Sequence, residues 1–227
     1  STGRWSRREV KTLVREGRVL VDGRIAGSAE EKYDAESCRI AVNGEELLLR
    51  RHTYVMLHKP AGVLSATEDG RGRTVLDLLT PELRKIGVFP VGRLDKDTEG
   101  LLLLTDDGEL AHALLSPKKH VDKVYYARVS GRLTPEDCAA FEAGMTLGDG
   151  LECLPAGLEI LAAGETSECL VTLREGKFHQ VKRMLAARGK PVTYLKRLSM
   201  GSLRLDDTLA PGEFRLLTAA EEAQLQR

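Results

Sequence analysis

Apolar residues near the start of the chain recur at the spacing of a short amphipathic helix. Val10, Leu13 and Val14 fall on one side of such a helix, and Gly17 follows as a residue suited to a left-handed helix end. Residues 6–9 read Ser-Arg-Arg-Glu, which has the form of a capping box and predicts that the helix starts there. Basic side chains fall largely away from the apolar stripe: Arg7, Arg8, Lys11 and Arg15. The pattern therefore predicts a helix with an apolar back and a basic front.

Two short apolar segments after this helix predict small strands that end in tight turns. Val19–Val21 runs into Asp22-Gly23, and residues 39–42 run into Asn43-Gly44. Asp-Gly and Asn-Gly are the pairs that two-residue hairpin turns favour. Residues 45–53 are interpreted as a linker, and a larger domain is predicted beyond them.

In that larger domain, apolar runs typical of strands are interspersed with amphipathic segments. The predicted strands cover residues 54–58, 88–91, 101–105, 123–129, 168–174, 192–195 and 202–205. The predicted helices cover residues 74–79, 109–115, 135–143 and 178–187, the first ended by Thr80-Pro81 and the last by Gly189. Strands and helices intermix at hairpin spacing, so the favoured class is α+β with a mainly antiparallel mixed sheet flanked by helices.

Composition narrows the class of protein. With 42% hydrophobic and 30% charged residues, the chain has the balance of a soluble globular protein with a real core. No apolar run approaches the ~20 residues of a membrane span and no signal segment opens the chain, so a cytoplasmic protein without a membrane anchor is expected. The cysteines lack metal-ligand spacing and are interpreted as reduced core thiols, without a metal site: Cys38, Cys138, Cys153 and Cys169. Disulfide scaffolds, zinc modules, membrane proteins and disordered tails are thereby excluded.

The charges are balanced overall but unevenly distributed. The chain has 34 basic and 34 acidic residues, yet residues 1–24 carry a net charge of +4 and residues 174–204 a net charge of +8. Residues 134–170 hold eight acidic residues and no base. Phosphate binding depends on local clusters, because salt screens charges beyond about 10 Å. One cluster alone is best explained as a solvated helix face, but two clusters separated by an acidic block favour binding to nucleic acid.

Two polar segments are candidates for chemistry. Residues 92–100 (Gly-Arg-Leu-Asp-Lys-Asp-Thr-Glu-Gly) place five ionisable side chains between two predicted core strands. A solvated hairpin loop is the simpler explanation, although a loop tied at both ends to core strands also suits a fixed functional carboxylate. Residues 174–184 form the second segment, which by itself is only a basic amphipathic helix that includes His179.

The first 48 residues resemble the S4-type RNA-binding module of ribosomal and RNA-modifying proteins. The resemblance is carried by Ser-Arg-Arg-Glu-Val at residues 6–10 and by Gly-Arg-Val-Leu-Val-Asp-Gly at residues 17–23. That module usually begins with an additional helix before the serine, and the sequence begins at Ser1. The resemblance therefore implies a small α/β module at 1–48 whose first helix is missing or trimmed.

Residues 53–227 resemble the catalytic domain of RsuA-type pseudouridine synthases. Five motifs occur in the family's order: Lys-Pro-Ala-Gly-Val at 59–63, Gly-Arg-Leu-Asp at 92–95 with Thr98, Lys-Val-Tyr at 123–125, Gly-Lys-Phe-His-Gln-Val-Lys-Arg-Met at 176–184 and Pro-Gly-Glu-Phe-Arg at 211–215. His-Gln-Val-Lys at 179–182 is more similar to the enzymes that act on 16S rRNA, because relatives acting on 23S rRNA more often carry Asn-Arg-Gln there. The resemblance implies isomerisation of a uridine to pseudouridine without a cofactor or a metal.

The resemblance also implies the catalytic residues. It places the essential carboxylate at Asp95, which either attacks the anomeric carbon of the ribose or removes the neighbouring ring proton. Lys182 matches the family's basic residue beside that carboxylate, where many relatives have arginine. Tyr125 matches the aromatic residue that stacks on the target base, and Leu173 is expected in the same pocket, where a buried strand leucine is the simpler interpretation. His179 by itself is more often a structural hydrogen-bonding residue than an acid or base.

The remaining expectations concern RNA. Arg93 is expected to engage a phosphate near the flipped nucleotide, and for Lys123 support of the pocket by a salt bridge is as good an interpretation as RNA contact. Further RNA contacts are expected from Lys177, Arg183 and the basic front of the first helix. The expected partner is 16S rRNA or a small-subunit assembly intermediate, bound by a monomer.

Alternatives remain open at this stage. The same chemistry on 23S rRNA is one, and a non-catalytic RNA-binding assembly factor is another. The combination of Asp95, Tyr125 and Lys182 argues against the assembly factor, since unused charges are costly to keep buried. A hydrolase with an aspartate nucleophile lacks an identifiable water-activating base.

Overall fold

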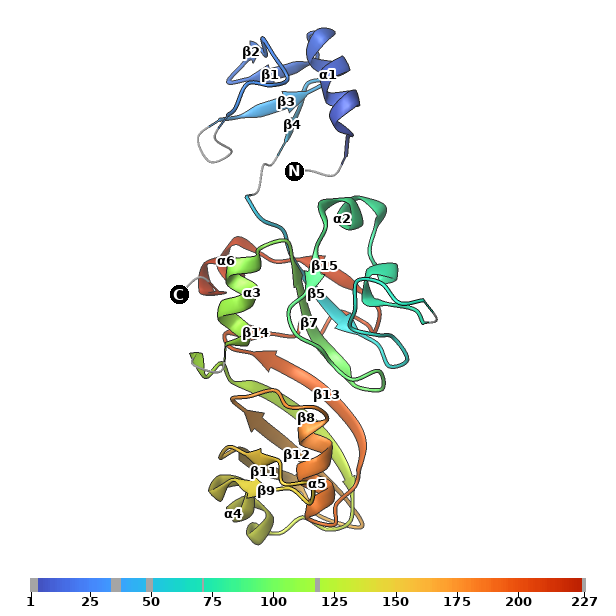
Figure 1. Ribbon diagram of the computed structural model, residues 1–227, viewed down its shortest axis with the longest axis vertical. Helices are drawn as coiled ribbons and strands as arrows, with labels where there is room; N and C mark the ends of the chain where they lie inside the picture. Colours follow the sequence, from blue (N-terminus) through green and yellow to red (C-terminus); the bar gives the residue numbers. More distant parts are fainter. Residues whose placement is uncertain (1–3, 34–37, 48–50, 71, 117–118, 226–227) are drawn as a thin grey trace. The chain divides into compact units, whose positions relative to one another are not determined.

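The chain forms two compact units (Figure 1). The computed structural model describes residues 4–33, 38–47, 51–70, 72–116 and 119–225. The first unit contains residues 1–53 together with residues 79–88, and the second contains residues 54–78 and 89–227. In the described residues, no helix is long and apolar enough to cross a membrane.

The first unit packs one helix against a small antiparallel sheet. Its helix α1 (Arg7–Arg15) begins at Ser6, whose hydroxyl accepts a hydrogen bond from the Glu9 amide while the Glu9 carboxylate accepts one from the Ser6 amide. The capping box predicted from the sequence is therefore confirmed. The sheet has the order β2-β1-β3-β4, formed by β1 (Val19–Val21), β2 (Arg24–Ile25), β3 (Ile40–Val42) and β4 (Glu45–Leu47). Leu13 of α1 is buried against the apolar residues of this sheet.

One expectation for this part of the chain is wrong and one is incomplete. The linker predicted at 45–53 begins with β4, because Asn43-Gly44 turns the chain back so that Val42 pairs with Glu45; residues 48–50 of that linker lie outside the described residues. The short helix predicted before Thr80-Pro81 is a 3₁₀ helix (Val75–Leu78), but a second helix that was not predicted starts at this pair. Pro81 is the first residue of α2 (Pro81–Ile86), a position where its missing N–H costs nothing.

The second unit contains a nine-stranded mixed sheet that confirms the predicted α+β class. Its main path has the order β11-β12-β8-β13-β7-β5-β15, with β14 beside β13 and β6 beside β7. The strands are β5 (Tyr54–Lys59), β6 (Phe89–Pro90), β7 (Glu99–Thr105), β8 (Lys123–Ser130), β11 (Gly157–Ala162), β12 (Thr166–Leu173), β13 (Val192–Met200), β14 (Leu203–Arg204) and β15 (Phe214–Leu216). Among the described residues, the pairing of β13 with β7 is parallel and the others are antiparallel. A separate ribbon pairs β9 (Met145–Thr146) with β10 (Glu152–Cys153).

Helices cover parts of this sheet. The helices of the second unit are α3 (Gly108–Leu115), α4 (Pro135–Ala143), α5 (Gln180–Ala187) and α6 (Ala219–Leu225). Ala111 and Leu114 of α3 and Leu225 of α6 join the core formed by inward residues of β5 and β7. The helix α5 packs against β13 and buries Met184 and Leu185 completely. It starts at Gln180 rather than at the predicted residue 178, because His179 adopts a left-handed backbone conformation with φ +51°.

Gly100 allows the parallel strands β7 and β13 to join. It pairs with Arg197 at φ +107°, and a Cβ atom there would lie 2.2 Å from the Arg197 carbonyl oxygen. No other residue type fits this contact, since every other one carries a Cβ atom. The two halves of the sheet therefore meet at a glycine.

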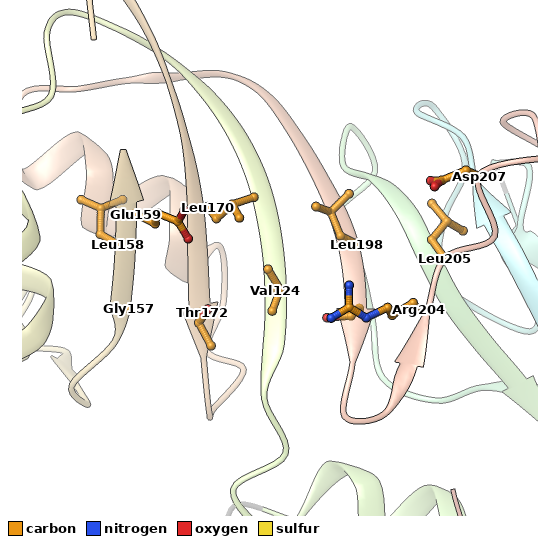
Figure 2. A pocket seen from close by; sticks show the side chains of 11 residues that line it. Val124, Gly157, Leu158, Glu159, Leu170, Thr172, Leu198, Arg204, Leu205 and Asp207 are labelled. Atoms are coloured by element: carbon orange, nitrogen blue, oxygen red, sulfur yellow. The ribbon is translucent and has the colours of Figure 1, made fainter. Parts of the chain in front are cut away.

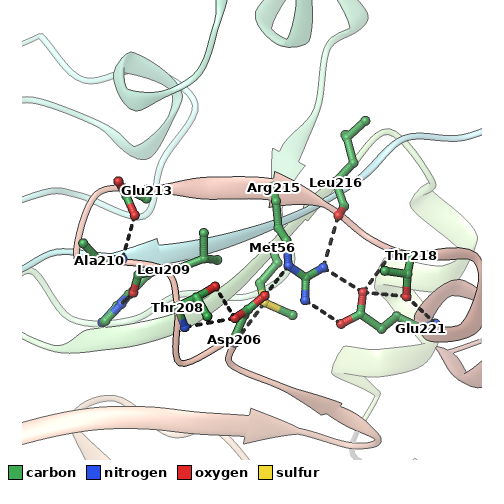
Figure 3. A network of polar contacts seen from close by, with 11 residues as sticks. Met56, Asp206, Thr208, Leu209, Ala210, Glu213, Arg215, Leu216, Thr218 and Glu221 are labelled. Atoms are coloured by element: carbon green, nitrogen blue, oxygen red, sulfur yellow. Dashed lines mark hydrogen bonds and ion pairs between the residues drawn. The ribbon is translucent and has the colours of Figure 1, made fainter.

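A network of ionic contacts fastens the last part of the chain (Figure 3). The Arg215 guanidinium donates to both carboxylate oxygens of Glu221 at 2.8 Å and to Asp206 at 2.6 Å. Thr208 and Thr218 donate further hydrogen bonds to these two carboxylates. The hydrogen bond from Arg215 is the main reason why the pKa of Glu221 falls from 4.5 to about 2.

Replacing Arg215 by methionine is expected to lower the free energy of unfolding by about 2 kcal/mol, or roughly 6 °C in Tm, because charge-assisted hydrogen bonds are lost. The folded-state pKa of Glu221 is below its unfolded value, so this stabilisation is present above pH 4.5 and is lost as the pH falls towards 2. Thermal unfolding at several pH values measures both effects, and the variant should lose less stability than the wild type across that window. An Arg204→Met variant, which removes an exposed arginine from neighbouring β14, is the control.

Candidate functional site

The loop between β6 and β7 is held rigidly by the segment that follows β5. The Gly62 amide donates to the Lys96 carbonyl at 2.7 Å, and the Ser65 hydroxyl forms hydrogen bonds with both the amide and the carbonyl of Leu94. Thr98 closes the loop by donating its amide to the Asp95 carbonyl at 3.1 Å. The carboxylate at position 95 therefore stands on a fixed backbone.

Lys59 is the central anchor of this loop. Its side chain is completely buried, and its ammonium group donates to the carbonyl oxygens of Pro60, Lys96 and Thr98 at 3.0, 3.2 and 2.9 Å. Burial lowers its pKa to about 8, although nearby carboxylates oppose this shift. Residues 59–63 were noted only as a family motif and the predicted strand ended at residue 58, so this function of Lys59 was missed; the signal was the Lys-Pro pair of that motif.

Asp95 lies beside Lys182, as the resemblance implies. The Lys182 ammonium group on α5 is 3.0 Å from one oxygen of the Asp95 carboxylate and 2.6 Å from the carboxylate of Asp97. The side chains of Asp95 and Lys182 are each 22% exposed, whereas that of Asp97 is 75% exposed. One lysine is thus shared by an enclosed carboxylate and an open one, and Asp97 was not predicted from the sequence.

The charges of this group support each other. Burial lowers the pKa of Lys182, but the hydrogen bonds to Asp97 and Asp95 outweigh that effect and raise the pKa overall. The hydrogen bond from Lys182 in turn lowers the pKa of Asp97, more than burial raises it. Lys182 is accordingly a permanent cation at neutral pH.

His179 lies on the other side of Asp95. Its Nε2 atom is 3.5 Å from the second oxygen of the Asp95 carboxylate, and its ring stacks on Phe178 with a centroid distance of 3.8 Å. Phe178 is 74% exposed. The left-handed backbone of His179 directs this exposed aromatic pair to the edge of the site, a placement that the sequence-based interpretation of His179 did not include.

Asp95 lines two adjoining cavities, of about 620 and 70 Å³, that extend from this loop to β8 and β12. Tyr125 lines both, and Leu173 lines the smaller one. The structure therefore brings Asp95 together with Tyr125 and Leu173, as expected. Tyr125 and Tyr126 occupy alternate faces of β8, and only Tyr125 points to this side.

The predicted RNA contacts lie in different environments. Arg93 is exposed and lines both cavities, and Lys123 is buried in the wall of the larger one. Lys177 also lines both cavities, but it pairs with Glu175 and donates to the Glu152 carbonyl. Arg183 lies outside them and pairs with Asp149 at 2.5 Å. On α1 of the first unit, the four predicted basic residues are all exposed: Arg7, Arg8, Lys11 and Arg15.

A further cavity of about 630 Å³ lies on the opposite face of the sheet (Figure 2). It is lined by residues of five strands, β8, β11, β12, β13 and β14, including Val124, Leu158, Leu170 and Leu198. Val124 follows Lys123 and precedes Tyr125, so alternation along β8 separates this surface from the carboxylate site. The predicted site residues all lie elsewhere.

In the part of the chain that the structure describes, no group of three or more histidine, cysteine, aspartate or glutamate side chains is arranged to hold a metal ion. What the site offers is one enclosed carboxylate, a lysine that neutralises it and a tyrosine in the same cavity wall.

Comparison with known proteins shows the family of the chain. The family model of RNA pseudouridylate synthases matches residues 53–187, and that of the S4 domain matches residues 2–37. The chain belongs to the RNA pseudouridine synthase family. The family, its activity on RNA and the presence of an N-terminal S4 domain, all inferred from sequence motifs, are confirmed.

Curated relatives match the synthase over nearly its full length. It is 49% identical to the "Uncharacterized RNA pseudouridine synthase YtzG" of Bacillus subtilis (strain 168), over 97% of this chain and 93% of the relative. It is 40% identical to the "Ribosomal small subunit pseudouridine synthase A" of Vibrio cholerae, over 97% of this chain and 94% of the relative. It is 38% identical to the "Ribosomal large subunit pseudouridine synthase B" of Bacillus subtilis, over 97% of this chain and 90% of the relative.

A solved structure shows the same fold. The crystal structure of a pseudouridylate synthase superposes with a TM-score of 0.72 at 34% sequence identity and covers 99% of this chain and 95% of that one. Relatives named for both ribosomal subunits are thus similar to the synthase, and the fold is common to the group.

Proposed function

We propose that the synthase isomerises one uridine of 16S rRNA to pseudouridine, on free rRNA or on an assembling small subunit. The observation that carries this proposal is the enclosed carboxylate of Asp95, which is ion-paired with Lys182 and lines a nucleotide-sized cavity. In it, residues 53–227 perform the chemistry and residues 1–48 form the RNA-binding module. The small-subunit target is supported by His-Gln-Val-Lys at 179–182 and by a 40% identical relative named for that subunit.

Asp95 is the proposed catalytic residue. Isomerisation detaches uracil from C1′ of the ribose, turns it and rejoins it through C5. The Asp95 carboxylate starts this sequence either by attacking C1′ or by removing the neighbouring ring proton. Both routes need the carboxylate in a fixed position, which the anchored loop and the Lys182 ammonium group 3.0 Å away support.

Tyr125 is proposed to receive the base. A uridine inside stacked RNA cannot reach Asp95, so it must be extruded into the cavity at a cost of a few kcal/mol. Stacking on the Tyr125 ring offsets about 1–3 kcal/mol of that cost, and the proposed function of its hydroxyl is to assist loss of the proton at C5. Leu173 completes the apolar wall beside it.

Tyr125→Phe is expected to leave RNA affinity within about twofold and to reduce turnover roughly 100-fold, the usual effect of losing a general acid or base. Tyr125→Ala is expected to lower affinity as well, because stacking is lost. Single-turnover kinetics and filter binding on the same transcript separate the two effects. If Tyr125→Phe turns over at the wild-type rate, stacking alone explains the tyrosine.

Phosphate contacts hold the RNA around this cavity. Arg93 is exposed at its edge, and Lys177 and Arg183 extend the positive surface, although their ion pairs with Glu175 and Asp149 must rearrange to bind phosphate. The exposed basic front of α1 provides a second contact region. Selection of a single uridine then follows from the shape of the RNA.

Mapping pseudouridines in cellular rRNA with and without this gene tests the proposed target. Loss of one site in 16S rRNA, restored by the wild-type gene but not by an Asp95→Asn copy, is the expected result. Loss of a site in 23S rRNA would replace the proposed substrate and keep the chemistry.

A further inference from the structure

Arg197 is a buried cation without a matching anion. It lies on β13 and is only 2% exposed. Its Nε atom donates to the Leu101 carbonyl at 2.8 Å, and its Nη2 atom is buried with no hydrogen-bond partner. Among the described residues, no acidic side chain lies within ion-pair distance of its guanidinium group. The hydrogen bond to Leu101 fixes the guanidinium but leaves its charge uncompensated.

Lys123 is a second buried cation beside it. Its side chain is 7% exposed, and its ammonium group donates to the Val121 carbonyl at 3.1 Å. Burial lowers its pKa, repulsion by Arg197 lowers it further, and Asp122 offsets only part of the shift. Asp122 itself is paired with Arg174 at 2.9 Å. The two cations therefore destabilise each other in the empty protein.

Both cations line the larger cavity that contains Asp95. Arg197 is the register partner of Tyr125 across the pairing of β13 with β8. Lys123 precedes Tyr125 by two residues, so the two share a face of β8 and their Cα atoms are about 7 Å apart. Two positive groups thus flank the tyrosine in the wall of the cavity.

Uncompensated buried charges are expensive, and proteins keep them where a ligand of opposite charge arrives. The arrangement fits a compact anion next to the base-stacking position, and the RNA backbone carries such an anion on either side of every nucleotide. We propose that Lys123 and Arg197 form a phosphate subsite that binds a backbone phosphate of the extruded uridine. The proposal rests on the proposed function and extends its set of phosphate contacts. Arg93 is an exposed residue of the cavity lining, whereas these two cations are buried in it.

Calorimetric titration of the full-length protein with uridine 3′,5′-bisphosphate and with uridine tests this subsite. We expect the bisphosphate to bind the wild type at least about tenfold more tightly than uridine, since one charge-assisted hydrogen bond is of that size. Lys123→Met and Arg197→Met should each remove most of this preference, and Arg197→Lys should restore part of it. Arg128→Gln is the matched control, because it removes one positive charge from an exposed position of β8, the strand that also carries Lys123.

Three results would overturn the subsite. The first is an unchanged preference for the bisphosphate in both methionine variants, and the second is no preference in the wild type. The third is an equal loss of affinity for uridine and bisphosphate in the variants, which would place the two cations against the nucleoside. The titration uses only mononucleosides and mononucleotides, so its outcome does not depend on which rRNA is the substrate. If the wild-type protein fails to modify 16S rRNA, that result contradicts the proposed target and leaves the phosphate subsite unaffected.

Unfolding measurements separate the subsite from a structural role. If Arg197 serves a ligand, Arg197→Met should unfold at the wild-type temperature or above it, because an uncompensated buried charge has been replaced by an apolar side chain of similar length. Loss of the phosphate preference together with a marked fall in Tm would assign Arg197 to the support of Leu101 and overturn the subsite.

Discussion

Asp95→Asn is expected to abolish pseudouridine formation, with single-turnover rates falling on the order of 10⁴-fold or more. Asparagine keeps the size of the side chain but has no negative oxygen to attack C1′ or to remove the neighbouring proton. The loop should keep its shape, because its anchors are main-chain contacts to Lys59, Gly62 and Ser65. Quantifying pseudouridine in 16S transcripts, together with RNA affinity and Tm, measures these outcomes.

Asp97→Asn is the matched control for this experiment. It makes the same chemical change two residues away, on a carboxylate that contacts the same lysine but is 75% exposed. We expect it to keep most of the wild-type rate, since Lys182 can then pair fully with Asp95. If the two variants lose activity equally, the enclosed carboxylate is not distinguished from the open one and the assignment of Asp95 is wrong.

Lys182→Met is expected to reduce turnover by about 10²–10³-fold, the range seen when one preorganised electrostatic contact is removed from an active site. The ammonium group 3.0 Å from one carboxylate oxygen of Asp95 disappears, and the His179 ring, 3.5 Å from the other oxygen, stays. RNA affinity should change by less than about threefold, because the charge of Lys182 is already matched by two aspartates. Single-turnover rates and binding constants measured on one transcript test this separation.

Lys182→Arg provides the complementary variant. A guanidinium group can form a two-pronged contact with a carboxylate, so we expect it to restore activity to within about tenfold of the wild type. A Lys182→Met protein that binds RNA poorly but turns over normally would instead assign Lys182 to RNA binding.

Local patterns predicted those parts of the molecule that depend on neighbouring residues. The capping box at Ser6 and Glu9 formed as expected because its partners are three residues apart. The strand predicted at residues 123–129 formed as well, as β8, and Tyr125 and Tyr126 lie on its alternate faces. The family motifs then placed Asp95 and Lys182 together although 86 residues separate them in the chain, which periodicity alone cannot do.

The features that were missed depend on distant partners. The strands β11 and β15 lie at the two ends of the sheet's main path, and their short segments become strands only by pairing with β12 and β5. The sequence analysis included Arg197 only as one charge of the basic cluster at 174–204. The residues next to it in the sequence do not show that β13 lines the cavity. The anchoring function of Lys59 was missed for the same reason, because its carbonyl partners at residues 96 and 98 are distant in the sequence.

The parallel contact between Gly100 and Arg197 also determines when activity can arise during protein synthesis. The pairings of β5 with β7 and of β8 with β12 bring together segments up to about fifty residues apart, whereas the joining strand β13 follows all four of these strands in the chain. Long-range pairing of this kind forms late and slowly. A chain still attached to the ribosome before residue 200 is made has Asp95 and Tyr125 but lacks the complete strand that pairs with both β7 and β8, so catalytic competence is delayed until translation has passed that residue.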